Sequence, residues 1–187
     1  MKKIHVRYGV LLLLMLLAAA SRLIPHPANF APIGAMALFG GAYFTRKWFA
    51  FLLPIVAMWM SDLYINNVIY GEYFDSFVWF YDGAWWTYGA MLLIAVAGML
   101  IIRKVSPVRI LAASLCASFL FFMISNFGVW VSSGMYPLTR AGLDACYIAA
   151  IPFFKNSLSA DLVYSTALFG CFELSLRFYP ALRLQEA

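Results

Sequence analysis

The sequence predicts an all-α membrane protein, a bundle of about six transmembrane helices that forms one domain over residues 1–187. Three observations support this: 65% of the residues are apolar, only 11% are charged, and the mean hydropathy is +0.85. An ordinary soluble domain is about half apolar and about a quarter charged. A soluble fold of this length would leave much of its apolar surface in water, because small domains bury a limited share of their area. A lipid bilayer is therefore the solvent that this composition fits.

Six apolar runs predict the spanning helices. They cover residues 8–24, 32–44, 48–65, 86–102, 108–131 and 157–178. The first run follows the basic segment MKKIHVR and contains Ala18-Ala19-Ala20, a pattern that also fits a signal peptide cleaved after small residues. We interpret it as an uncleaved helix because another membrane segment follows it. In both interpretations the chain emerges on the outside at residue 25, so the topology of the remaining segments is unaffected.

The second and third runs are both shaped by proline. Pro25, Pro27 and Pro32 remove backbone donors that a helix requires, so the second helix is expected to begin near residue 32. Its sequence, GAMALFGGAYF, is short for a full span. The third run carries Pro54 and ends in SDLY, after which residues 66–85 form an aromatic and acidic loop.

The remaining runs complete the bundle. The fourth ends at Arg103-Lys104, and the fifth ends in SNFGVWV. After a polar stretch, the next apolar run is expected to break at Pro152, Lys155 and Asn156, since proline lacks a backbone N–H and polar side chains are costly in lipid. The last span is therefore expected to begin only at residue 157.

The basic residues predict the orientation of the chain. If consecutive runs alternate across the bilayer, ten of the 13 basic residues fall on one side. They are Lys2, Lys3, Arg7, Arg46, Lys47, Arg103, Lys104, Arg109, Arg177 and Arg183. Lys and Arg are retained on the cytoplasmic side of a membrane. We therefore expect a multi-pass protein of the cytoplasmic (inner) membrane with both termini in the cytoplasm, and no nucleic-acid partner.

No motif predicts catalysis, a metal site or a cofactor. The sequence contains no GxSxG, HExxH, CxxC or GxxxxGK[ST]. Three widely spaced cysteines, Cys116, Cys146 and Cys171, indicate neither a disulfide framework nor a zinc site. A membrane enzyme built on Asp62 and Asp161 is a third-ranked hypothesis, which requires both carboxylates in one cavity. We expect a protein that is not an enzyme.

Candidate binding residues lie in the three segments expected outside and at the outer ends of the helices. These segments concentrate aromatic and polar side chains, which is typical of an aromatic belt at the headgroups, but the density over residues 66–85 favours a loop that covers an organic ligand. Charged groups within apolar runs are functional candidates because their burial in hydrocarbon costs several kcal/mol. The candidate solute-binding residues are His26, Asn29, Asp62, Trp79, Tyr81, Asn126, Arg140 and Asp161.

The buried charges also have a structural interpretation. Asp62 and Asp161 are each expected near the outer end of a helix, where Arg22, Arg140 and Lys155 are available as partners. Such an ion pair would hold two helices in register. The ion-pair and solute-contact interpretations are equally compatible with the sequence.

Two further patterns concern contacts between helices. Glu173 precedes Arg177 by one turn, which predicts an i,i+4 ion pair. Small residues such as Gly34, Gly40 and Gly41 permit close approach of helices. Packing within the chain is the favoured interpretation of these small residues, and a docking face for another membrane subunit is the alternative.

Several stretches resemble a bacterial family of small, uncharacterised six-helix membrane proteins to which a transport role is attributed. The matching stretches are SRLIPHPANFAPIGAMALFGGAYF at 21–44, SDL at 61–63, FFMISNFGVW at 121–130, YP at 136–137 and GLDACYIAAIPFFKNSLSADLVY at 142–164. The resemblance covers most of residues 21–178 and implies transport without naming a substrate.

More distantly, the size, six helices and inside termini are similar to the substrate-binding S components of energy-coupling factor (ECF) transporters. That resemblance implies outer loops that close over a vitamin or metal ion, and alanines of the first helix that contact a membrane coupling subunit. Ala18-Ala19-Ala20 is the nearest equivalent in the first span, whereas the AxxxA spacing occurs at Ala31 and Ala35. Solitary relatives of S components take up corrinoids, a substrate class to which His26 would offer one ligand.

Two functional hypotheses follow. The leading one is a membrane transport protein that binds a small, partly aromatic or heterocyclic organic solute or vitamin-like nutrient on the outer face for uptake. The alternative is a non-transporting membrane subunit or assembly factor that acts through helix–helix contacts. The expected partners are the solute, the lipid bilayer, and a membrane coupling subunit or a second copy of the chain.

Overall fold

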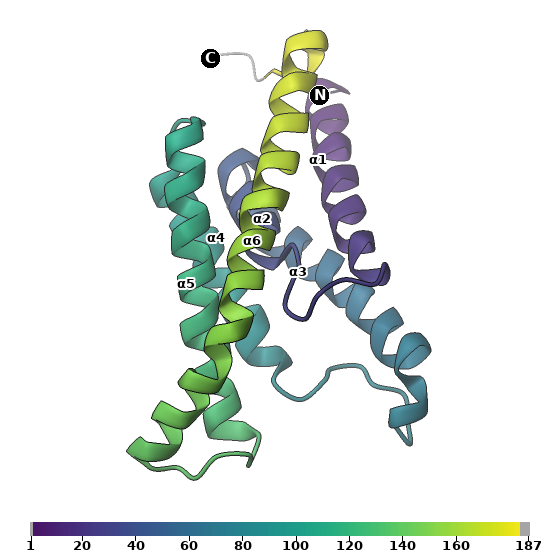
Figure 1. The fold of residues 1–187 in the computed structure, drawn as a ribbon. Coiled ribbons are helices and arrows are strands. Elements are labelled where there is room, and N and C mark those ends of the chain that lie inside the picture. Colours follow the sequence, from purple (N-terminus) through teal and green to yellow (C-terminus); the bar gives the residue numbers. More distant parts are fainter. Residues whose placement is uncertain (1, 184–187) are drawn as a thin grey trace.

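The computed structural model describes residues 2–183, and within that range the chain is helical, without strands (Figure 1). The α-helices are α1 Lys2–Ala20, α2 Ile33–Tyr43, α3 Lys47–Tyr64, α4 Ala84–Ile101, α5 Pro107–Ser132 and α6 Arg140–Phe178. Short 3₁₀ turns (η1 Ser21–Leu23, η3 Gly71–Tyr73, η4 Pro180–Leu182) and one π-turn (η2 Ile65–Ile69) extend or link them. The predicted all-α fold is confirmed.

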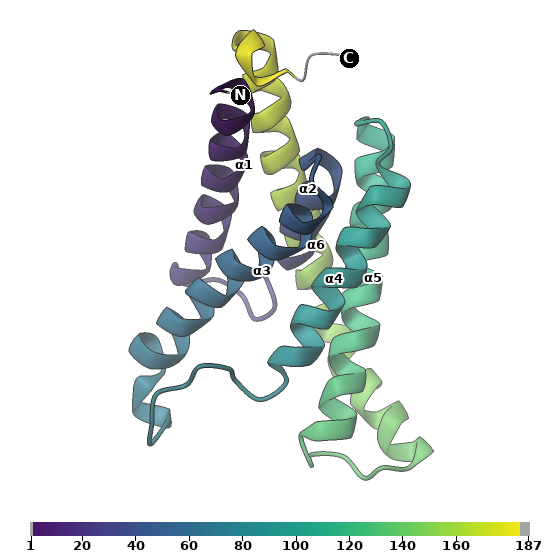
Figure 2. The same ribbon diagram turned by 180° about the vertical axis from the view of Figure 1, so that it is seen from behind.

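The described chain runs up and down, and both of its ends lie at the same end of the bundle (Figures 1 and 2). The α2–α3 and α4–α5 links lie toward this end, whereas the α3–α4 and α5–α6 links lie at the opposite, distal end. Arg7 Nη1 donates a hydrogen bond to the Leu182 carbonyl at 2.8 Å, which ties the first helix to the last turn of the described chain.

Within the described residues, four helical segments are long and apolar enough to cross a bilayer. They are Val6–Leu23, Lys47–Ile69, Ala84–Ile101 and Pro107–Ser132. The 39-residue α6 exceeds the length of a span but carries Asp144, Lys155, Asp161 and Glu173 among its apolar residues. This composition is that of a membrane helical protein.

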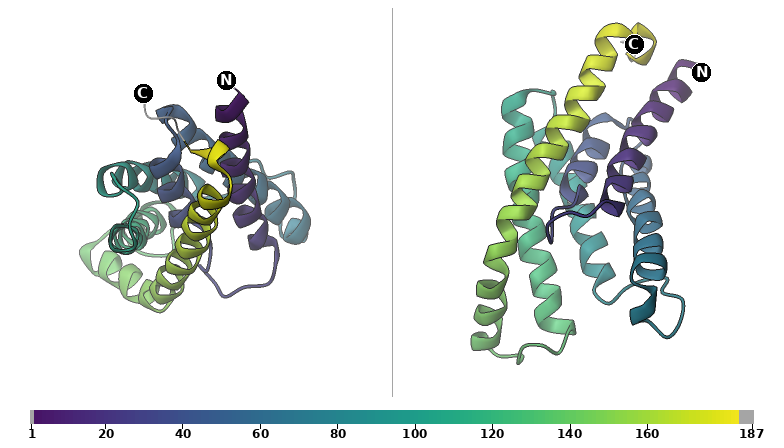
Figure 3. Two further views of the ribbon diagram at one scale, coloured as in Figure 1. Left: turned by 90° about the horizontal axis from the view of Figure 1, so that it is seen from above. Right: turned by 45° about the vertical axis from the view of Figure 1, so that its right-hand side comes forward.

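The short helix α2 lies at the centre of the molecule (Figure 3). Its 11 residues extend about 16 Å at 1.5 Å per residue, roughly half the hydrocarbon thickness. It contacts α3, α4, α5 and α6, and nearly all of its residues are buried. Its start and end match the predicted segment 32–44, and its length makes it a half-helix inside the bundle.

Glycines explain how α2 approaches its neighbours. A Cβ atom on Gly41 would lie 2.5 Å from the Ala95 carbonyl oxygen of α4, and one on Gly40 would lie 2.9 Å from the Ala50 carbonyl oxygen of α3. Contacts this close to backbone atoms exclude any larger side chain without movement of a helix. The small residues of α2 therefore serve packing within the chain.

The predicted break at Pro152 is wrong, because α6 continues through it from Arg140 to Phe178. A proline removes one backbone hydrogen bond and usually kinks rather than ends a helix that neighbours support. Here α6 packs along α5 over a long distance (Figure 2), and Pro152 itself is exposed. The neighbouring polar residues also have partners: Asn156 Nδ2 donates to the Ala28 carbonyl at 3.0 Å.

The predicted Glu173–Arg177 pair is also wrong. Glu173 instead accepts a hydrogen bond from Tyr43 Oη of α2. The buried Arg7 guanidinium lies beside them, 5.0 Å from the ring centroid of Phe172. Phe39, Phe169 and Phe172 fill the interior here, each at most 1% exposed. An aromatic cluster thus closes the bundle on the side of the termini.

The packing of α2 predicts a difference between two matched glycine substitutions. Gly41→Ala should lower the unfolding free energy by about 1–3 kcal/mol, because the new methyl group overpacks the α2–α4 contact. Gly89→Ala on α4 is the control, since nothing lies within 4 Å of its added Cβ and alanine favours a helix by about 1 kcal/mol. Thermal unfolding in detergent measures both. Equal stability of the two variants would show that the close α2–α4 contact is absent.

Candidate functional site

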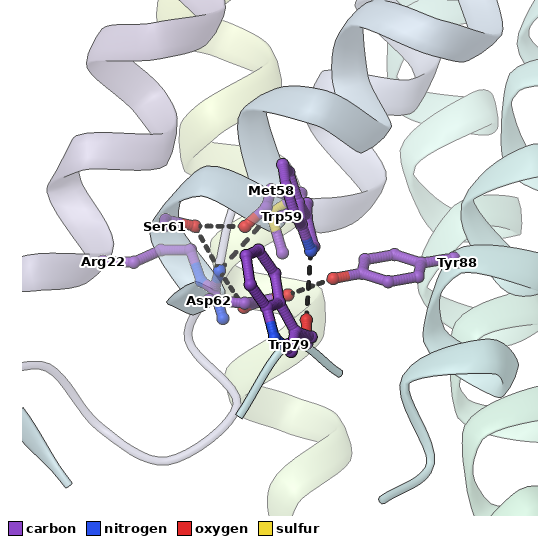
Figure 4. A network of polar contacts seen from close by, with 7 residues as sticks. All are labelled: Arg22, Met58, Trp59, Ser61, Asp62, Trp79 and Tyr88. Carbon is purple, nitrogen blue, oxygen red and sulfur yellow. Dashed lines mark hydrogen bonds and ion pairs between the residues drawn. The ribbon is translucent and has the colours of Figure 1, made fainter. Parts of the chain in front are cut away.

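Asp62, near the end of α3, is the centre of a buried polar network (Figure 4). Arg22 of η1 lies on one side, with its Nη1 2.6 Å from Asp62 Oδ1. Tyr88 of α4 lies on the opposite side, and its hydroxyl donates to Asp62 Oδ2 at 2.7 Å. Both carboxylate oxygens are therefore used, and the network joins the end of α1 to α3 and α4. The predicted pairing of Asp62 with Arg22 is confirmed.

The guanidinium group of Arg22 is held from several sides. Its Nη1 also donates to Ser61 Oγ, which in turn donates to the Met58 carbonyl at 2.7 Å. Its Nε is buried and has no hydrogen-bond partner among the described residues. Arg22 therefore keeps one unused donor beside its ion pair.

Asp161 of α6 is bound in a different way. Its Oδ1 accepts a hydrogen bond from the Ala35 backbone N–H at 3.1 Å, and its Oδ2 accepts one from Ser118 Oγ at 2.6 Å. A Cβ atom on Gly34 would lie 2.4 Å from Asp161 Oδ1, so the carboxylate reaches the first turn of α2 only because residue 34 is glycine. Asp161 thus supplies a hydrogen-bond acceptor for the N-terminus of α2, which lies inside the protein.

The two carboxylates differ in charge compensation. Asp62 and Asp161 are each 3% exposed. Among the side chains that the structure describes, Arg22–Asp62 is the one recorded ion pair, so none of their basic groups pairs with Asp161. The predicted pairing of Asp161 with Arg22, Arg140 or Lys155 is therefore wrong.

A cavity of about 410 Å³ lies between the two carboxylates at the distal end. We call it the distal cavity. Six of the eight candidate residues line it: His26, Asn29, Asp62, Tyr81, Asn126 and Asp161. The wall also includes Arg22 and the aromatic rings of Phe121, Phe122, Phe153 and Phe154. The structure therefore brings together residues that are up to 139 positions apart, from 22 to 161.

The α1–α2 loop, which carries His26 and Asn29, is fixed to α6. Asn29 adopts a left-handed backbone conformation, with φ of 60°, which asparagine tolerates better than most residues. Its carbonyl accepts a hydrogen bond from Ser157 Oγ at 3.2 Å, and the adjacent Ala28 carbonyl accepts one from Asn156. These contacts hold the loop over one side of the distal cavity.

The segment between α3 and α4 is also ordered by specific contacts. Asn67 exchanges two hydrogen bonds with the Val78 backbone, at 2.6 Å and 2.9 Å. Trp59 Nε1 donates to the Trp79 carbonyl at 3.0 Å. Trp79 is 60% exposed and lies outside the distal cavity, whereas Tyr81 lines it. Burial raises the pKa of the Tyr81 hydroxyl above its ordinary value, so this group stays neutral.

The remaining candidates lie on α5 and α6. Asn126 lines the distal cavity, and its Nδ2 donates to the Phe122 carbonyl at 2.7 Å, so its side-chain oxygen has no recorded partner in the described residues. Arg140 is the first residue of α6 and is exposed, outside the cavity. Arg140 and Trp79 are thus the two candidates that the structure does not bring to the cavity.

Sequence reasoning missed several residues that position the site. Tyr88 and Ser118 bind the carboxylates, while Asn67, Asn156 and Ser157 hold the loops. A single polar residue in an apolar run carries a weak signal, since tyrosine and serine occur there as ordinary packing residues. Asn156 belongs to the predicted helix break, and Ser157 is the first residue of the predicted last span.

The Arg22–Asp62 pair predicts non-additive changes in stability. Arg22→Gln and Asp62→Asn should each lower the unfolding free energy by about 2 kcal/mol or more, because each leaves the other charge buried without its partner. The double variant should lose less than the sum of the two. Thermal unfolding of the four proteins in detergent measures this, with Arg140→Gln as the control at an exposed arginine. Simple additivity would indicate that the two charges do not interact.

A family model described as a family of unknown function, DUF6580, matches residues 2–182. No curated protein and no solved structure matches the chain. Because the family model covers nearly all of the sequence, the chain belongs to DUF6580.

Proposed function

We propose that this protein binds a small organic solute in the distal cavity and takes it up across the membrane. The observation that carries the proposal is the cavity itself, which gathers two buried carboxylates, an arginine and several uncharged polar groups between helices of a membrane protein. Charged groups inside a membrane bundle generally mark a path or site for a solute or ion.

The size and lining of the distal cavity fit a small organic molecule. Its volume of about 410 Å³ falls within the range of about 300–1,000 Å³ that is typical of ligand sites. Phe122 and Phe154, with ring centroids 5.0 Å apart, offer aromatic faces, while Asn126 and Asn29 offer hydrogen bonds. Such a wall suits a partly aromatic or heterocyclic solute.

The basic residues give the orientation that we propose. Arg7, Arg46, Lys47, Arg103 and Lys104 belong to the end of the bundle that carries both described termini. With that end in the cytoplasm, as the retention of basic residues favours, the distal cavity opens on the outer face of the cytoplasmic membrane. The chain then has both termini inside.

Uptake also needs a path past the aromatic cluster. Phe39 on α2 and Phe169 on α6 lie beyond the distal cavity toward the termini, and their ring centroids are 5.4 Å apart. Buried rings at this spacing leave no open route, so the solute passes only if α2 or α6 shifts. Movement of one group of helices against another around a central site is the usual way in which such proteins change access.

A ligand screen with cavity variants tests the proposal. Purified protein is heated in detergent with vitamins, corrinoids, purines and divalent metals, and a bound solute should raise the apparent stability by about 2.7 kcal/mol at a hundredfold excess over its dissociation constant. His26→Ala and Asp62→Asn should abolish the shift, because both residues line the cavity. Arg140→Gln and Asp144→Asn, which change exposed residues outside it, should retain the shift.

Uptake into cells provides the second measurement. Asp62→Asn should reduce transport of the solute found in the screen while the protein still accumulates in the membrane. Full uptake by this variant would remove Asp62 from the site. Loss of function in Gly41→Leu, together with silent cavity variants, would instead favour a subunit that acts through helix contacts.

A further inference from the structure

We infer that the solute carries a positive charge, as a protonated amine or a cationic heterocyclic nitrogen, and that Asp161 is its counter-ion. This inference rests on the proposed function, because it names the class of solute for the same cavity. It is argued from the balance of charges around the distal cavity.

Counted formally, with both carboxylates ionised and His26 neutral, the side chains that line the distal cavity leave one negative charge. Asp62 and Asp161 contribute one each, Arg22 contributes one positive charge, and His26 is the remaining titratable side chain besides Tyr81. Arg22 and Asp62 lie 2.6 Å apart and cancel each other. The carboxylate of Asp161 is then the group that lacks a positively charged partner among the described side chains of the wall.

The partners of Asp161 favour its ionised form without neutralising it. They are the Ala35 N–H at the start of α2 and the Ser118 hydroxyl, both hydrogen-bond donors to the carboxylate. A helix N-terminus is equivalent to about half a positive charge, so a net negative charge remains. The surrounding protein has a lower dielectric constant than water, which increases the attraction of this charge for a cation that enters.

The same geometry disfavours an anionic solute. The N-terminus of α2 is the natural anion site in the cavity wall, but the Asp161 carboxylate already occupies it. The positive charge of Arg22 is already paired with Asp62 through Nη1. A carboxylate or phosphate on the solute would face two aspartates and no free cation among the described residues of the wall.

The aromatic side chains complete a cation site. Phe121, Phe122, Phe153 and Phe154 line the distal cavity on α5 and α6, the two helices that also bring Ser118 and Asp161. The face of an aromatic ring attracts an ammonium or a charged heterocycle, by about 0.5–2 kcal/mol per contact. An apolar body with one positive charge therefore has complementary groups on this wall.

The charge preference of the cavity can be measured before the solute is known, by the reaction of a cysteine on the cavity wall with charged thiol reagents. Cys116, Cys146 and Cys171 are replaced by alanine, and Ser125→Cys places a thiol on the cavity wall. Its position on α5, seven residues from Ser118, puts it about 10 Å along the helix from the Asp161 contact. The rates of modification by trimethylammonioethyl and sulfonatoethyl methanethiosulfonate are measured and divided by the rates for free cysteine.

The expected result is a normalised cation-to-anion rate ratio well above one. Asp161→Asn should lower this ratio by about fivefold or more, since one charge about 10 Å away acts with opposite sign on the two reagents. Asp144→Asn is the control, because it removes an exposed carboxylate of the same helix outside the cavity. That variant should leave the ratio unchanged.

Two outcomes overturn the inference. A ratio at or below one in the protein with Asp161 intact shows that the cavity does not select cations, even if Asp161→Asn fails to fold. An equal ratio with and without Asp161 shows that another group sets the preference. The ligand screen is independent of this measurement. A high cation-to-anion rate ratio without any bound solute would overturn the proposed uptake. A bound solute together with a low ratio would overturn only the positive charge assigned to the solute.

Discussion

Helix α2 begins inside the protein, where the backbone N–H groups of its first turn need acceptors. The need to satisfy these donors organises the rest of the bundle. An unpaired N–H that is buried away from water would cost several kcal/mol. The carboxylate of Asp161 supplies the acceptor, and Ser118 fixes the second carboxylate oxygen. Because these groups come from α6 and α5, one buried carboxylate binds three helices. Gly34 is required for it, since its missing side chain leaves space for the carboxylate.

The half-length of α2 also creates the distal cavity. A helix of 11 residues fills the bundle only toward the termini, where Phe39 and Tyr43 pack against Phe169 and Phe172. On the distal side its place is taken by the α1–α2 loop, which α6 holds through Asn156. The loop cannot fill the space as a helix would, and a hollow lined by polar ends of helices remains. The cavity and the buried carboxylate of Asp161 therefore have a common origin: α2 begins inside the bundle instead of at its distal end.

The sequence predicted the class of fold and most helix boundaries, because composition and proline positions act locally. The segments predicted at 32–44, 48–65, 86–102 and 108–131 lie within two residues of α2, α3, α4 and α5 at each end. The prediction failed at Pro152, where support from α5 outweighs the lost hydrogen bond. It failed again for Glu173, whose partner comes from α2. Asp62, Asn126 and Asp161 were recognisable as polar groups in apolar runs, and His26, Asn29 and Tyr81 as residues of outer loops. Tyr88 and Ser118 are recognisable only once the helices are placed.

Asp62 and Asp161 show why burial alone does not assign a role to a charged residue. Both are 3% exposed and both line the distal cavity. Asp62 has a full counter-charge in Arg22, so its chief effect is to join η1, α3 and α4, and its loss would disturb the wall. Asp161 has only dipolar partners, so it contributes both the position of α2 and an electric field in the cavity. Although the hydrogen bonds of Asp161 position α2, the electric field of its carboxylate still acts on a ligand in the cavity. This is the physical basis for the proposed binding of the solute at α6.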